Sequence, residues 1–114
     1  MLTLDALRDY GANVTEGLAR CLNNEAFYLR LVKMAAQDDS YGKLYGALEQ
    51  KNYDAAFEIA HTLKGVLGNL SLTPLNDPVS ELTELLRKRT DMDYAAYIAL
   101  IKEQHGKLLS ACEE

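Results

Sequence analysis

The chain of 114 residues is long enough for one domain with one hydrophobic core, and too short to hold a second catalytic module such as a complete kinase. Its 17 acidic residues outnumber its 12 basic ones, and the net charge of -5 argues against nucleic acid, a partner that would require a basic face. No apolar run approaches the roughly 18 residues needed to cross a bilayer, and no basic-then-apolar leader opens the sequence. A cytoplasmic protein without a membrane partner is therefore expected.

The sequence predicts a chain made of α-helices. Helix-forming residues dominate, and no segment shows sustained period-two alternation of β-branched residues. In chain order, helices are expected over residues 3–10, 14–22, 25–37, 40–50, 54–70, a stretch ending near residue 89, and residues 94–111. The breaks are short, and short connections make neighbouring helices antiparallel. We therefore expect one domain over residues 1–114, an all-α up-and-down four-helix bundle made of the last four helices, with small additional N-terminal helices.

The start of the sixth helix has two solutions. Thr73 followed by Pro74 has the residue types of a helix N-cap and first turn, and Asp77 followed by Pro78 has the same. Either the helix begins at Pro74 and tolerates a local break, or it begins at Pro78 after a longer loop. We expect a start near Pro74, with weak hydrogen bonding in the first turn.

The helix expected over residues 54–70 has two distinct faces. At about 100° per residue, one stripe collects apolar residues that would face a bundle core. They are Ala56, Ile59, Leu63, Val66, Leu67 and Leu70. His61 points away from that stripe, toward solvent. The residues that flank it on the outward face are Asp54, Phe57, Glu58, Lys64, Gly65 and Gly68.

His61 and Lys64 are the residues of this face that carry chemistry. A lone histidine is often no more than a solvated surface residue, and the same is true of a lysine. Three residues apart on a helix, however, the Lys64 ammonium can reach a phosphoryl group attached to the His61 ring and offset its negative charge. The pattern indicates His61 as a candidate nucleophile, with Lys64 as its support.

Two glycines and a phenylalanine on the same face leave alternatives open. Gly65 and Gly68 each cost about 1 kcal/mol relative to alanine inside a helix, so the bare backbone must serve some contact. That contact is either a partner protein that approaches the imidazole or another helix of this chain that packs closely. Phe57 is either a docking contact for a partner or a contact with an N-terminal helix.

His105 and the two cysteines are interpreted as structural residues. His105 lies on an apolar stripe of the last helix, so burial with a hydrogen bond is expected. Cys21 and Cys112 stand singly in helical apolar patterns, which is typical of free buried thiols in a reducing compartment. Neither the histidines nor the cysteines have the spacing of a metal site, and no bound metal is expected.

Residues 60–70 resemble the phosphoacceptor motif of the histidine phosphotransfer family, in which His, Leu-Lys-Gly and a later small residue recur at the spacings of Ala-His-Thr-Leu-Lys-Gly-Val-Leu-Gly-Asn-Leu. Residues 24–31 resemble the early helix of that family, and residues 52–56 its usual lead-in. The resemblance covers about 100 residues, as expected for a single-domain member. The sequence departs from the family pattern at Ser71, where many members have glycine, and at Pro78, inside what is usually a regular helix.

The resemblance implies a phosphocarrier whose His61 accepts a phosphoryl group from the aspartate of a response-regulator receiver domain and donates it to another, without ATP. It implies modification at Nε2, support by Lys64, and receiver docking over Gly65 and Gly68, with Phe57 as a further docking candidate. No cofactor is expected in this chain, because the receiver brings the Mg²⁺. The expected partners are receiver domains, including that of a hybrid histidine kinase. The protein is expected to be a monomer. It is expected to have no kinase activity of its own and so to be a phosphocarrier, not an enzyme.

Other functions compete with this interpretation. The phosphoacceptor domain of a sensor kinase also carries histidine on a helix, but an acidic residue and a proline normally follow, where this chain has Thr62 and Leu63. A non-catalytic adaptor would bind a response regulator through the His61 face without chemistry. A metalloenzyme is disfavoured, because the chain has only two histidines and they lie on opposite kinds of face.

Overall fold

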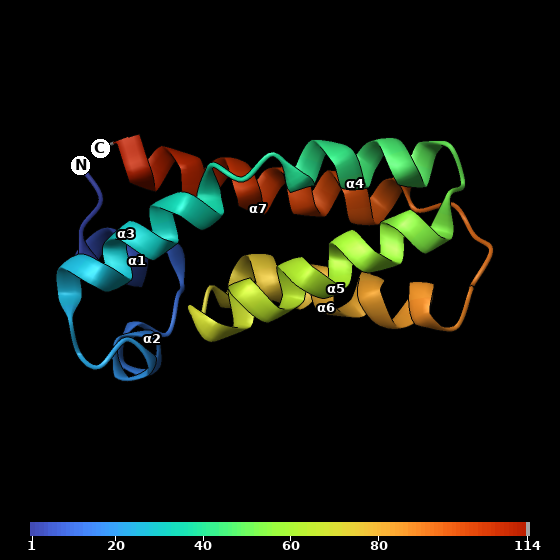
Figure 1. Ribbon diagram of the computed structural model, residues 1–114. Helices are drawn as coiled ribbons and strands as arrows, with labels where there is room; N and C mark the ends of the chain where they lie inside the picture. The colour runs from blue at the N-terminus through green and yellow to red at the C-terminus, as the bar shows by residue number, and fades with distance from the viewer. Residues whose placement is uncertain (114) are drawn as a thin grey trace.

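The computed structural model describes residues 1–113, which form seven helices and no strand (Figure 1). The helices are α1 (Leu4–Tyr10), α2 (Val14–Arg20), α3 (Glu25–Ala36), α4 (Ser40–Glu49), α5 (Tyr53–Asn69), α6 (Thr73–Arg87) and α7 (Ala95–Glu113). Every helix expected from the sequence is present, with ends displaced by about one or two residues. In this part of the chain no helix has the length and apolar character needed to span a membrane.

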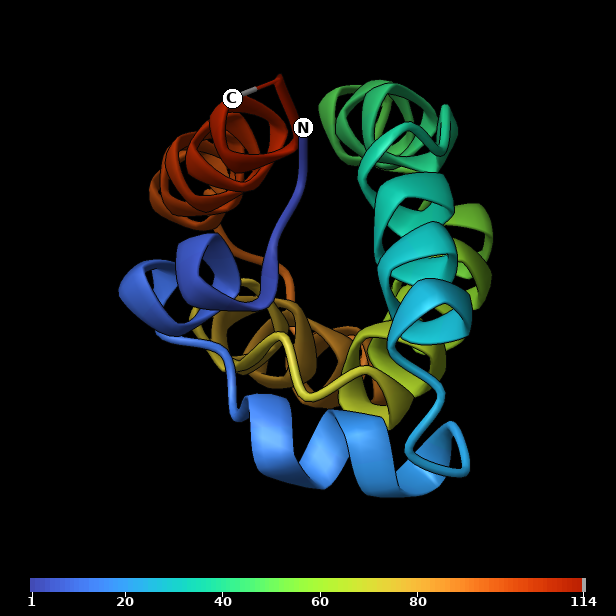
Figure 2. The same ribbon diagram turned by 90° about the vertical axis from the view of Figure 1, so that its left-hand side faces the viewer.

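Four columns of helix form the bundle (Figure 2). α5, α6 and α7 each supply one column, and α4 supplies the fourth together with α3, which leads into it across a bend at residues 37–39. α1 packs against α7, and α2 links α1 to α3 beside the end of the bundle. The predicted four-helix bundle is confirmed. The sequence places α3 among the small additional helices, but at 12 residues it is longer than α4, which has 10.

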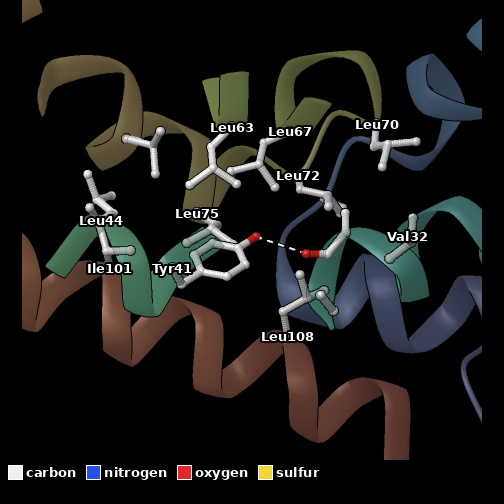
Figure 3. Packing of buried hydrophobic residues seen from close by; sticks show 14 of the residues in the cluster. Val32, Tyr41, Leu44, Leu63, Leu67, Leu70, Leu72, Leu75, Ile101 and Leu108 are labelled. Carbon is white, nitrogen blue, oxygen red and sulfur yellow. Dashed lines mark hydrogen bonds between the residues drawn. The ribbon is translucent and has the colours of Figure 1, made fainter. Parts of the chain in front are cut away.

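The core lies between the columns and is apolar. Leu63 and Leu67 of α5 lie over Leu75 of α6 and Leu108 of α7 (Figure 3). These side chains are at most 3% exposed, and each leucine buried in this way contributes about 2 kcal/mol of transfer free energy. The core therefore holds α5 along one side and leaves the other side for His61.

The apolar stripe predicted for α5 is confirmed only in part. Its buried members are Ala56, Leu63, Leu67 and Leu70. Ile59 is half-buried, and the prediction for Val66 is wrong, because this side chain is 39% exposed. Val66 lies opposite α3, which turns out of the line of α4 at the bend. The result is an open groove whose apolar lining includes Leu31, Met34 and Val66.

Side chains satisfy the backbone carbonyl groups at the bend between α3 and α4. The Tyr41 hydroxyl donates to the Ala35 carbonyl at 3.1 Å, and the Nε2 of His105 donates to the Ala36 carbonyl at 2.7 Å. The His105 ring also stacks on Tyr41, with centroids 3.8 Å apart. The predicted hydrogen bond of His105 is confirmed, although the residue is half-buried rather than fully buried. These contacts give the bend a defined geometry.

The sixth helix, α6, begins at Thr73, so the alternative with a start near Pro74 is confirmed. Leu72 occupies the N-cap and has no side-chain hydrogen bond there, whereas Thr73, predicted as the cap, is the first helical residue. Pro78 lies buried inside the helix. Because proline has no backbone N–H, one hydrogen bond of the first turns is lost, as expected from the sequence.

The turns that end α4, α5 and α6 are built alike. Each places a residue with φ between 55° and 57° just after the helix, namely Lys51, Ser71 and Arg89. In each turn the next amide donates to a carbonyl of the last helical turn, at 2.8 to 3.0 Å. This is the Schellman arrangement, in which glycine is the usual residue at positive φ. The backbone at Ser71 therefore explains why glycine is common there in proteins with this motif.

Replacing Ser71 with glycine is expected to raise the free energy of unfolding by about 0.5–1 kcal/mol, because positive φ strains a residue that carries a Cβ atom. Urea denaturation followed by circular dichroism measures the change. Ser110→Gly, on an exposed position inside α7, is the control and should lower the free energy of unfolding by about 0.5–1 kcal/mol. A loss of stability in both variants would contradict this account of the turn.

Candidate functional site

His61 lies in the middle of α5, on the face opposite the core. Its side chain is exposed, as the sequence predicts. The imidazole stacks on Phe57, one turn earlier, with ring centroids 5.5 Å apart and planes inclined by 14°. Phe57 is half-buried and packs against the core. The stacking contact therefore restricts the orientation of a histidine that remains open to solvent.

Lys64 follows His61 by almost one helical turn and extends toward α6. Its Nζ lies 3.7 Å from Oε2 of Glu84. The same oxygen accepts a hydrogen bond from Nε of Arg87 at 3.2 Å. The Arg87 guanidinium in turn lies over the ring of Phe57, 5.1 Å from its centroid. A loop of contacts thus joins the histidine on α5 to the charged face of α6.

Glu84 is the anion at the centre of this cluster. The hydrogen bond from Arg87, together with the positive charge of Lys64, holds the pKa of the Glu84 carboxyl below its usual value. The group is therefore ionised at neutral pH and is shared by two cations. The side chains of Lys64, Glu84 and Arg87 are between 39% and 50% exposed, so water and salt weaken each pair.

Gly65 and Gly68 border a shallow hollow beside His61. The hollow is lined by Arg20, His61, Lys64, Gly65, Gly68, Asn69 and Asn76. A Cβ atom at Gly65 would meet no atom within 4 Å, and one at Gly68 would meet Nδ2 of Asn76 at 3.5 Å, an ordinary contact. Close packing within the chain therefore does not explain either glycine. Of the two explanations that the sequence leaves open, this geometry favours approach by a partner.

Residues from α2 and α3 hold the end of α5 beside the hollow. Nη1 of Arg20 donates to the Gly68 carbonyl at 2.5 Å, and the hydroxyl of the buried Tyr28 donates to the Leu70 carbonyl at 2.9 Å. Gly17 of α2 makes room for Tyr28, since a Cβ atom there would lie 2.6 Å from the ring. The last turn of α5 is thus positioned by helices that come much earlier in the chain.

Sequence patterns do not identify Arg20, Glu84 or Arg87 as neighbours of His61. Glu84 and Arg87 are three residues apart, a spacing that indicates an ion pair on a helix. The pattern does not show that this pair faces α5, because that depends on the register of the two helices. Arg20 has no local signal at all. Only the packing of α2 against the end of α5 brings it to the site.

The face that carries His61 is open. The hollow beside it is shallow, and within residues 1–113 no three potential metal ligands come together. The hollow that adjoins the imidazole is open to solvent and does not enclose a small substrate. A small helical bundle that presents one histidine and one lysine on such a face has the arrangement of a protein that carries a group between larger partners.

Comparison with protein families identifies the family to which this bundle belongs. The model of the Hpt domain family matches residues 29–111, most of the chain, and the protein belongs to that family. Hpt domains are phosphocarriers that take part in two-component phosphotransfer. The match runs from α3 into α7 and so includes every column of the bundle. A comparison with curated proteins and one with solved structures found no match.

Replacing His61 with glutamine is expected to leave the free energy of unfolding nearly unchanged, because the side chain is exposed and contributes little packing. His105→Gln is the matched variant and should lower that free energy by about 1–3 kcal/mol, since it disturbs both the stack on Tyr41 and the hydrogen bond at the bend. Thermal unfolding and urea denaturation of the two proteins measure the difference. Equal stability of the two variants would contradict the structural role of His105.

Proposed function

We propose that this protein is a phosphorelay intermediate that accepts a phosphoryl group on His61 from the aspartate of one receiver domain and passes it to the aspartate of another. The observation that carries the proposal is the exposed His61, with Lys64 on the same helix face and the open backbone of Gly65 beside it. The chain has no autonomous kinase activity on this account, and ATP takes no part in either step.

The proposed chemistry is one displacement at phosphorus, run in either direction. Nε2 of the neutral imidazole, with the proton on Nδ1, attacks the phosphorus of the receiver's aspartyl phosphate. The N–P bond forms as the P–O bond to the aspartate breaks, and the carboxylate leaves. In the second step an aspartate oxygen attacks the same phosphorus and the N–P bond breaks. We assign the Mg²⁺ to the receiver, so this chain needs no cofactor of its own.

Lys64 supports the phosphoryl group in this proposal. Its ammonium is on the same face of α5 as His61 and close enough in sequence to lie beside a group attached to the ring. Positive charge there offsets the negative charge that the phosphoryl group brings. Phe57 assists by holding the imidazole in place through the stacking contact.

The receiver docks over the open backbone of α5 in this proposal. Gly65 and Gly68 admit it, and the exposed apolar side chains of Met34 and Val66 in the neighbouring groove offer further contact area. The sequence leaves Phe57 as either a docking contact for a partner or a contact with an N-terminal helix. Its ring contacts His61 of α5 and Arg87 of α6, which favours a supporting role at the site over contact with an N-terminal helix.

We also propose the setting in which the relay works. Cys21 and Cys112 are free and buried, as the sequence predicts, and burial raises the pKa of the Cys112 thiol, which keeps it protonated and unreactive. Unpaired thiols support a reducing, cytoplasmic location. We infer that the protein acts as a monomer and that its partners are receiver domains, with that of a hybrid histidine kinase among them.

Incubation with a purified receiver domain that carries labelled aspartyl phosphate is expected to transfer the label to the wild-type protein. His61→Gln should abolish labelling, whereas His105→Gln should retain it in the folded protein. Gel electrophoresis under conditions that preserve phosphohistidine measures both. Transfer to the His61→Gln variant would overturn the assignment of the acceptor.

Two further outcomes of the same experiment identify the competing functions. Receivers that bind the protein but never label it would show a non-catalytic adaptor, provided that a panel of different receivers is used. Labelling by ATP and Mg²⁺ alone, without a receiver, would show a self-phosphorylating kinase domain instead of a relay intermediate.

Replacing Gly68 with glutamine is expected to block docking and slow transfer while the fold remains intact. The change removes a glycine from inside a helix, and the added Cβ atom would make only an ordinary contact with Asn76, at 3.5 Å, so the free energy of unfolding should stay constant or rise by about 0.5–1 kcal/mol. Initial rates of transfer from a receiver and thermal unfolding are measured on the same preparation.

Gly106→Gln is the control for this substitution. Gly106 lies on an exposed part of α7, where an added Cβ atom would meet no atom within 4 Å, so glutamine there should be tolerated equally well. It should leave transfer unchanged because Gly106 belongs to α7 and does not line the hollow beside His61. A Gly68→Gln protein that is destabilised yet transfers at the normal rate would defeat the docking account.

A further inference from the structure

One charged residue beside the acceptor has no role in the transfer proposed above. Glu84 projects from α6, and its Oε2 lies 3.7 Å from the ammonium of Lys64 and 3.2 Å from Nε of Arg87. It is therefore the anion that Lys64 contacts while His61 carries no phosphoryl group. Lys64, which the proposed transfer assigns to the phosphoryl group, is thus already paired with the Glu84 carboxylate.

We propose that Glu84 is a positioning residue that holds Lys64 in the unphosphorylated protein and gives it up to the phosphoryl group when His61 is loaded. The inference rests on the proposed function of His61 and assigns a regulatory contact to the same site. Glu84 thereby opposes loading, and it keeps phosphohistidine ready to pass its group on.

Charge determines the direction of this exchange. A phosphoryl group carries more negative charge than one carboxylate, and it would be attached to the helix on which Lys64 itself lies. The flexible Lys64 side chain therefore moves from Glu84 to the phosphoryl group once that group arrives. The Lys64 side chain is 39% exposed and flexible, so its ammonium is free to turn from one anionic group to the other.

Arg87 makes the exchange possible without leaving a carboxylate unpaired. Its Nε is hydrogen-bonded to Glu84, and its guanidinium is held over Phe57. When Lys64 leaves, Glu84 keeps the Arg87 contact and stays ionised. Arg87 thus anchors the carboxylate on α6, so that Lys64 is the member of the cluster that moves.

Removing the carboxylate should shift the transfer equilibrium toward the loaded histidine. In Glu84→Gln, the unphosphorylated protein loses the contact with Lys64 and the phosphorylated protein loses a nearby negative charge. Because all the groups are partly exposed, the expected increase in the equilibrium constant for loading is about two- to five-fold. The probe is a receiver domain that labels the wild-type protein, mixed at known concentrations and followed to equilibrium.

Glu81→Gln is the matched control. Glu81 lies on the same helix, is exposed, and forms no ion pair with any described residue, so this variant changes net charge equally without touching Lys64. It should leave the equilibrium within experimental error of wild type. An equal shift in both variants would overturn the proposal and show a general effect of net charge.

A double-mutant cycle with Lys64→Met separates an effect through the lysine from direct repulsion between Glu84 and the phosphoryl group. Lys64→Met alone should lower the equilibrium constant for loading. If Glu84 acts through Lys64, the gain from Glu84→Gln shrinks in the Lys64→Met background. A gain of the same size in both backgrounds would overturn the positioning role.

A measurement on the unphosphorylated protein tests the contact without any transfer. The side-chain ammonium signal of Lys64 in nuclear magnetic resonance spectra should move in Glu84→Gln and stay in place in Glu81→Gln. An unmoved signal in both would overturn the resting contact. Wild-type protein that no receiver labels would instead count against the proposed function, and this spectrum would still report on the contact.

Discussion

The backbone carbonyl groups at the end of α5 are the point on which the arrangement of the molecule depends. A helix leaves its last carbonyls without partners inside the helix. Here amides of the following turn bind some of them, and groups from far away in the chain bind carbonyls of the last turn and of the turn after it. Arg20 binds the carbonyl of Gly68, Tyr28 binds that of Leu70, and the amide of Asn13 binds that of Ser71 at 3.0 Å. The N-terminal helices are therefore attached to the bundle through the same helix that carries the histidine.

This attachment sets the course of α3, and the course of α3 shapes the surface near His61. α3 must reach the end of α5 with Tyr28 and then continue into α4, which requires the bend that Tyr41 and His105 stabilise. The bend leaves Val66 uncovered. The apolar groove beside the face of His61 is thus a consequence of how the end of α5 is held. The hollow at Gly68 borders the same region, since Asn69 lines both and Arg20 lines the hollow.

Local patterns predicted much of this structure, and their failures have physical causes. The 100° periodicity of residues 54–70 predicted correctly that His61 faces outward, because the burial of a helix face is a periodic property of the sequence. The same periodicity wrongly predicted that Val66 is buried. Periodicity assigns one face to the core along the whole helix, whereas α3 covers only part of that face near the end of α5. The cluster of Glu84 and Arg87 could not be predicted, because it requires the register of α5 against α6. The two helices are joined by a turn in which Ser71 has positive φ. Glycine at this position would have marked the turn in the sequence, and serine does not.

The residues clustered around His61 are also close together along the chain, and this has a consequence for how the protein folds. His61, Lys64, Glu84 and Arg87 belong to one helical hairpin, in which α5 and α6 are joined through residues 70–72. Contacts between consecutive helices close short loops, which costs little entropy and makes them early events in folding. The hairpin can therefore assemble before α2 and α3 dock against its end. On this order of events, the cluster of His61, Lys64, Glu84 and Arg87 takes shape first. The N-terminal helices complete the surrounding surface later, when Arg20 reaches the hollow and α3 supplies one side of the groove.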